Sequence, residues 1–176
     1  LEEHATASVI VDHLAPMLRA QGHDVTVIDY PYMDNGDDLA ATVRAINAGN
    51  YDISISVHCD SSDSPSSRGA HVCHHRTYHD DGTCTDSVQG KDLAEAIAGP
   101  LCKLLPGRAD HVQARPDRSC TPPKSSLYVL RKTNPPAVLV ECGFISNAGD
   151  TDLMKNNPAA IARAIAWGVN TYTQRK

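Results

Sequence analysis

The sequence of 176 residues has no apolar run near the roughly 18 residues of a membrane-spanning helix, so we expect no membrane span. It has no excess of positive charge, and its formal net charge of −5 argues against a nucleic-acid partner. It has no internal repeat and no linker. Its first residues, Leu1-Glu2-Glu3-His4, are acidic where a signal peptide is basic. We therefore expect a single domain, residues 1–176, with no signal peptide.

Cysteine and histidine are frequent instead, with six and nine residues. There is no Cys-x-x-Cys pair and no zinc-finger spacing. The sequence leaves open both buried free thiols and a bridge such as Cys73–Cys84. The stretch Cys73-His74-His75, followed by His79, fits no standard metal-ligand spacing, so a solvated loop is the preferred interpretation.

Hydrophobic periodicity alternates between helix and strand along the chain. Helices are expected at about 3–21, 37–48, 88–105 and 146–154, and from Pro158 onward. Strands are expected at 24–29, 53–58, 69–75, 127–130 and 137–141, and the segments 78–86 and 106–124 are expected to be loops. Helices that alternate with strands predict an α/β layered domain.

Two apolar strands end in side chains capable of chemistry, His58 and Glu141. Ligands of open α/β sheets bind beyond the carboxyl ends of strands, and Glu3 begins a helix that can reach the same edge. One glutamate and two histidines would form a zinc site with a position open for water, and Glu141 could act as general base. Each residue also has a structural interpretation: His58 as a satisfied strand-end histidine, Glu141 as an ion-pair member, and Glu3 as an acid favoured by the helix dipole.

Several segments resemble the zinc-dependent N-acetylmuramoyl-L-alanine amidases of the Amidase_3 type. Residues 130–147, LRKTNPPAVLVECGFISN, are similar to that family's LRxTxxPAVLVExGFxSN stretch, which is the most specific match. Residues 56–60, SVHCD, resemble the family's S-[IV]-H-x-N segment, with Asp60 in place of asparagine. Glu3 and the helix after it resemble the family's opening, and Gly69-Ala70-His71-Val72 is similar to its G-x-x-V/T segment.

The resemblance implies a mixed sheet of about six strands flanked by helices, a phosphorylase/hydrolase-like amidase fold. It implies hydrolysis of the amide between N-acetylmuramic acid and L-alanine in peptidoglycan, with Zn²⁺ as the cofactor. Glu3 and His58 become metal ligands and Glu141 the catalytic glutamate. His71 could border the cleft, and Arg131 could bind a substrate carboxylate or form a surface salt bridge.

The chain departs from the family pattern at its start. The family opens with a strand ending in D-P-G-H-G-G, which supplies the first zinc histidine, and no such segment is present. We interpret the first strand as missing from this chain. Gly22-His23 lies at a helix end, and His4 is a poor substitute ligand.

Three functions remain open. The preferred one is a zinc amidase of the cell wall, either a lysin or a bacterial hydrolase, monomeric and acting outside the cytoplasm. The second is a non-catalytic relative that binds peptidoglycan or a regulatory partner. The third is a zinc carboxypeptidase acting on wall peptides, which the match at residues 130–147 disfavours.

Overall fold

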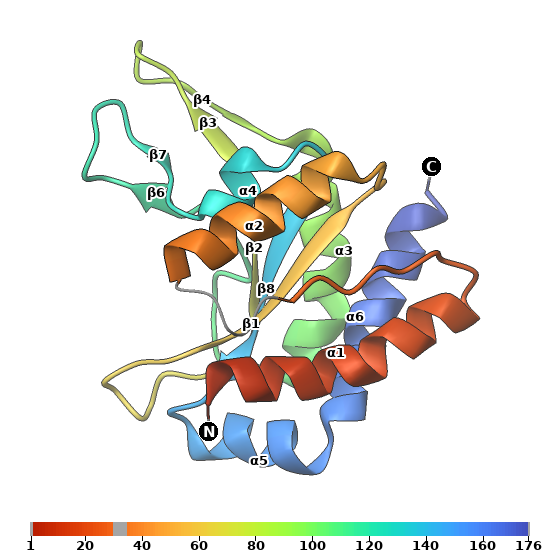
Figure 1. Cartoon of the computed structure of the whole chain (residues 1–176). Helices are drawn as coiled ribbons and strands as arrows, with labels where there is room; N and C mark the ends of the chain where they lie inside the picture. Colours follow the sequence, from red (N-terminus) through yellow and green to blue (C-terminus); the bar gives the residue numbers. More distant parts are fainter. Residues whose placement is uncertain (1, 30–34, 176) are drawn as a thin grey trace.

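The computed structural model describes residues 2–29 and 35–175, and it places a mixed sheet between layers of helices (Figure 1). The main sheet has the strand order β1-β8-β2-β5. Its strands are β1 (Ser54–Asp60), β8 (Ala137–Phe144), β2 (His71–His74) and β5 (Val112–Gln113). β8 runs parallel to β1 and antiparallel to β2, which in turn runs parallel to β5. The predicted mixed sheet flanked by helices is confirmed, with four strands among the described residues rather than about six.

Among the described residues, six helices pack around the sheet. They are α1 (Glu3–Ala20), α2 (Asn35–Ala48), α3 (Val88–Leu104), α4 (Tyr128–Lys132), α5 (Ala148–Asn156) and α6 (Pro158–Thr173). Five of them, all except α4, begin or end close to where periodicity placed them. Ser87 caps α3 by accepting from the Gly90 amide, and Asn147 caps α5 by accepting from the amides of Gly149 and Asp150.

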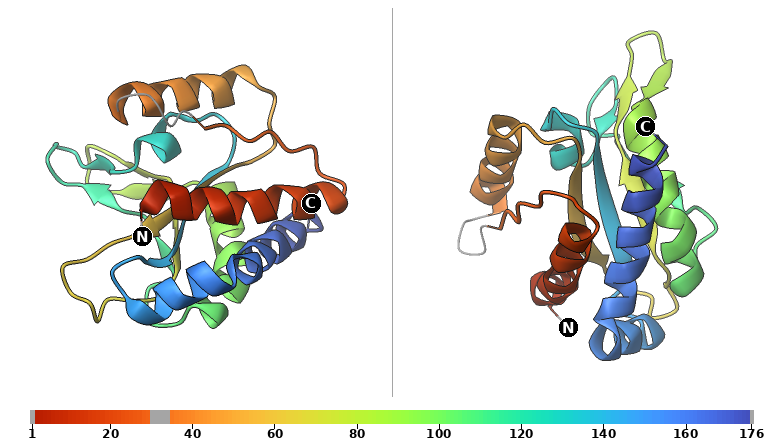
Figure 2. Two further views of the ribbon diagram at one scale, coloured as in Figure 1. Left: turned by 60° about the horizontal axis from the view of Figure 1, so that its bottom comes forward. Right: turned by 90° about the vertical axis from the view of Figure 1, so that its right-hand side faces the viewer.

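The central strand β8 is buried along its whole length, and its alternate side chains serve two cores. Val138 and Val140 join the larger cluster, built with apolar residues of α1, α3 and α6. Ala137 and Leu139 join a smaller cluster with residues of α2 and α4. Helices therefore cover both faces of the sheet, as Figure 2 shows from the side. This explains why the strand reads as a continuous apolar run.

Three expectations for the connecting segments were wrong. Residues 127–130 do not form a strand, because Leu127 precedes the short helix α4 and the buried Val129 and Leu130 pack on β8 from it. Segment 78–86 is not simply a loop. It contains most of a hairpin of β3 (Arg76–Tyr78) and β4 (Cys84–Asp86), held by an ion pair from Arg76 to Asp86. A second hairpin joins β6 (Pro116–Asp117) and β7 (Lys124–Ser125). The segment 106–124, expected to be a loop, therefore contains two short strands, because β5 pairs with β2 and β6 pairs with β7.

The predicted strand 24–29 does not pair with any strand that the structure describes. This segment and β1 line the two sides of a groove of about 1060 Å³, with α1 and α2 also contributing. Its apolar lining includes Val25, Val27, Ile55 and Val57. The groove therefore separates the outer edge of β1 from residues 24–29, which were expected to form a strand.

No helix within residues 2–29 and 35–175 is long and apolar enough to cross a membrane. All six cysteines are free thiols, and Cys73 is buried in the core while Cys84 is exposed, so no Cys73–Cys84 bridge is present.

Candidate active site

Three polar side chains lie in one row across the sheet. His58 of β1 stands opposite Glu141 of β8, and His71 of β2 stands opposite Glu141 on its other side. Side chains alternate along strands, so this row shares the face that carries Ala137 and Leu139. The predicted pair His58 and Glu141 is thus brought together, and His71 adjoins it.

A bulge in the sheet follows the row. Between β1 and β8 the register passes from His58 opposite Glu141 to Asp60 opposite Phe144, so β8 carries an extra residue. Gly143 adopts a φ of +99°, which side chains rarely tolerate, and an added Cβ would lie 3.0 Å from Asp150 Oδ2. The bulge is held by Asp150, whose Oδ2 accepts from the backbone amides of Gly69 (2.7 Å) and Phe144 (2.9 Å).

Glu3 and His58 meet at the open side of the row. His58 Nδ1 donates to Glu3 Oε1 over 2.8 Å, and both side chains are partly exposed. This hydrogen bond is the main reason that the pKa of Glu3 is lowered. Burial works to lower the pKa of His58, but the bond to Glu3 and the negative charges of Glu141 and Glu3 outweigh it, so that pKa is raised. The predicted ligand pair is therefore in contact.

Glu141 is the buried carboxyl group of the site, with 7% of the residue exposed. Burial, followed by the charge of Asp60, raises its pKa from 4.5 to about 7. Its Oε2 is buried and has no hydrogen-bond partner, while Oε1 lies 3.7 Å from Arg115 Nη2. A carboxyl group that titrates near neutrality can both accept and return a proton.

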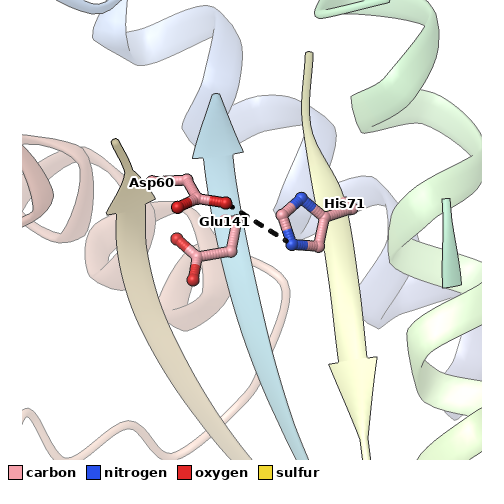
Figure 3. A group of neighbouring side chains, drawn as sticks. All are labelled: Asp60, His71 and Glu141. Carbon is pink, nitrogen blue, oxygen red and sulfur yellow. Dashed lines mark ion pairs between the residues drawn. The ribbon is translucent and has the colours of Figure 1, made fainter. Parts of the chain in front are cut away.

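A second group of ligand-type side chains adjoins the row. One ligand atom each of Asp60, His71 and Glu141 lies within 4.8 Å of the others, so these residues form a candidate metal-binding group (Figure 3). His71 is fully buried, and burial, with the charges of Arg115 and Arg108, lowers its pKa to about 3. The guanidinium of Arg115 touches this group, at 3.4 Å from Asp60 Oδ2 and in contact with His71 Nε2.

Other candidates from the sequence lie outside this cluster or have other partners. His4 is bonded to Asp29 at 3.0 Å and does not join Glu3 and His58. His23 follows the end of α1. Arg131 donates to the Ser125 carbonyl at 2.6 Å and stacks over Tyr128. Sequence reasoning missed Arg115, because it sits in a segment without periodicity and only the pairing of the flanking strands brings it to the site.

The comparisons with known proteins agree with one another. Residues 1–171 match the family model described as N-acetylmuramoyl-L-alanine amidase. The chain is 32% identical over 136 residues to the N-acetylmuramoyl-L-alanine amidase LytC of Bacillus subtilis (strain 168), which covers 76% of this chain. It spans only about a quarter (24%) of that relative's length.

Solved structures share the fold. One is the catalytic domain of the CD27L endolysin targeting Clostridia difficile, with a TM-score of 0.76 and 25% identity, covering 96% of this chain and 83% of that one. Another is the N-acetylmuramyl-L-alanine amidase Ami1 of Mycobacterium smegmatis, with a TM-score of 0.79 and 21% identity, covering 99% and 78%. With its family model matched over nearly the whole sequence, the chain belongs to the N-acetylmuramoyl-L-alanine amidase family.

Proposed function

We propose that this domain is a zinc hydrolase that cleaves the amide between N-acetylmuramic acid and L-alanine in peptidoglycan, with Glu141 as its proton-transfer group. The observation that carries the proposal is the buried Glu141 carboxyl, with a pKa near 7, in register with His58. Membership of the amidase family supplies the substrate class. The substrate assigns its action to the cell wall, outside the cytoplasm, and we expect a monomer.

Glu3 and His58 would hold the zinc ion. Their facing atoms, one carboxylate oxygen and one imidazole nitrogen 2.8 Å apart, are ligand types that zinc binds in catalytic sites, and their partial exposure leaves a path for an ion. When bound, zinc lowers the pKa of a water molecule toward 7 and polarises a carbonyl oxygen.

Glu141 would then move the proton. In its ionised form, the unpartnered Oε2 accepts a proton from the water that attacks the lactyl carbonyl. The protonated carboxyl next gives that proton to the nitrogen of L-alanine as the amide bond breaks. Burial raises the pKa of Glu141 to about 7 in the metal-free domain, which favours its use as a group that takes and returns one proton.

The substitution Glu141→Gln tests this role. Glutamine has nearly the same size as glutamate but cannot gain or lose a proton. We therefore expect the variant to keep its fold and its zinc content and to lose hydrolysis of the cell wall. Products distinguish the reaction class: a new amine on L-alanine identifies the amidase, whereas a released terminal amino acid identifies a carboxypeptidase. Cleavage by the variant at the wild-type rate would exclude Glu141 as the proton-transfer group.

The alternative is a non-catalytic relative that binds peptidoglycan or a regulatory partner. It is favoured by one observation: His4, the substitute considered beside the predicted ligands Glu3 and His58, is bonded to Asp29 and does not join them. Zinc content measured beside a turbidity assay on cell walls separates the two functions. About one zinc per chain with lysis supports the amidase, and no zinc with no lysis supports the binder. Supplying a strand with a terminal Gly-His-Gly segment then tests whether a third ligand restores both.

A further inference from the structure

Arg115 is the one described cation in contact with all three side chains of the candidate metal-binding group. Its Nη2 lies 3.4 Å from Asp60 Oδ2 and 3.7 Å from Glu141 Oε1, and it donates to His71 Nε2. These partners come from β1, β8 and β2, so one guanidinium group contacts side chains of three neighbouring strands.

The backbone fixes Arg115 at this position. It lies between β5, which pairs with β2 through Val112 and Gln113, and β6, which pairs with β7 from Pro116 onward. Its own carbonyl accepts from the Ser126 amide at 2.8 Å. Strand pairing on both sides of Arg115 and this hydrogen bond fix its backbone. The position of the guanidinium group is therefore set by paired strands rather than by an unpaired loop.

His71 is suited to hold this cation. Arginine can only donate hydrogen bonds, so Nε2 of His71 must offer its lone pair, and the ring proton is then on Nδ1. A neutral, fully buried imidazole therefore anchors the guanidinium without adding a second positive charge.

Glu141 is polarised by the same arrangement. Its Oε1 faces the fixed cation, while its Oε2 has no partner. The two oxygens are thus distinguished before any substrate binds: one faces a permanent charge and the other is available for proton transfer. A metal ion at Asp60, His71 and Glu141 would have to displace Arg115, because two cations would share the same few ångströms.

We propose that Arg115 is a positioning residue that fixes Glu141 through Oε1, and that it is the resident cation of the Asp60–His71–Glu141 group, which therefore binds no metal ion of its own. The first part rests on the proposed function. The second part concerns the occupant of the group and can be tested whether or not the domain hydrolyses peptidoglycan.

The test compares Arg115→Gln, Arg115→Lys and the matched control Arg118→Gln, an exposed arginine of the same segment. Zinc chloride is titrated into each protein by calorimetry, after circular dichroism shows the native fold. Arg115→Gln should bind one more zinc ion per chain than the wild type, and adding Asp60→Asn should abolish the extra site. Arg118→Gln and the charge-preserving Arg115→Lys should keep the wild-type number. No extra zinc in Arg115→Gln, or extra zinc in Arg115→Lys, overturns the resident-cation assignment.

Kinetics on muropeptides test the positioning role. Arg115→Gln should lower kcat by about 10- to 100-fold with KM within about twofold, since a misplaced carboxyl slows the chemical step rather than binding. Added guanidinium ion should restore part of kcat in Arg115→Gln and none in Arg118→Gln. A wild-type kcat in Arg115→Gln overturns the positioning role. An inactive wild-type domain instead refutes the proposed hydrolase and leaves the zinc counts as the test of the cluster.

Discussion

Replacing Glu141 by glutamine should stabilise the metal-free domain at alkaline pH. In the folded protein the pKa of Glu141 is about 7, against 4.5 for an ordinary glutamate. The native state therefore holds a proton that the unfolded chain has released between those pH values. Such a group favours folding below pH 4.5, and this advantage is lost as the pH rises through 7.

The expected magnitude follows from the two pKa values. Their difference corresponds to about 3 kcal/mol at pH 8 and less than about 1 kcal/mol at pH 5. Glutamine cannot ionise, so it does not bear this cost. Any packing penalty of its amide is present at both pH values and cancels in the comparison. The pH dependence of the difference therefore reports the titration of Glu141, whose pKa is raised by burial and by the charge of Asp60.

The assay is urea unfolding in EDTA at pH 5 and pH 8. Relative to the wild type, Glu141→Gln should gain about 2 kcal/mol more at pH 8 than at pH 5, which moves the urea midpoint by about 1 M. The control Glu95→Gln removes an exposed carboxylate on α3 and should show no such change. If the free energy of unfolding changed with pH in the same way in Glu141→Gln and in the wild type, the ionised Glu141 carboxylate would not destabilise the folded domain, and the reasoning would be refuted.

Three further predictions concern packing and reactivity. Gly168→Ala should cost about 2–3 kcal/mol in urea unfolding, because the new Cβ would overlap the backbone of Ile97 on α3. A loss under about 1 kcal/mol would contradict this close helix contact. Asp150→Ala should cost about 3 kcal/mol by leaving two buried amides unpaired, and a loss under about 1 kcal/mol would argue against that bridge. Iodoacetamide should label the exposed Cys84 well before Cys142, because Cys142 is buried and burial raises the pKa of its thiol. Labelling in the reverse order, measured by mass spectrometry, would contradict the burial pattern.

Much of the site could be predicted because its residues stand where patterns change. His58 follows a segment in which apolar and polar residues alternate, and Glu141 is a charged residue that follows a continuous apolar run. Both residues can therefore be identified from the sequence pattern. Glu3 begins a clear helix. The register that makes His58 and Glu141 neighbours depends on strand pairing, which one sequence does not specify.

The position of Arg115 could not be predicted from the sequence. Arg115 lies among residues without periodicity, and its role depends on two short pairings, with β2 and within the β6–β7 hairpin. The pattern at residues 127–130 predicts a strand as readily as the observed helix Tyr128–Lys132, because four apolar or aromatic residues in a row fit either state. Only packing on β8 decides between them.

The open edge of β1 has a consequence for how this chain behaves at high concentration. Within the part of the chain that the structure describes, no strand pairs with the outer side of β1, so its backbone amides and carbonyls on that side can template a strand from another molecule. The sequence of Ser54–Asp60 contains neither lysine nor proline, the residues that commonly block such pairing. Self-association through this edge should rise with protein concentration, and a strand that fills the neighbouring groove should suppress it.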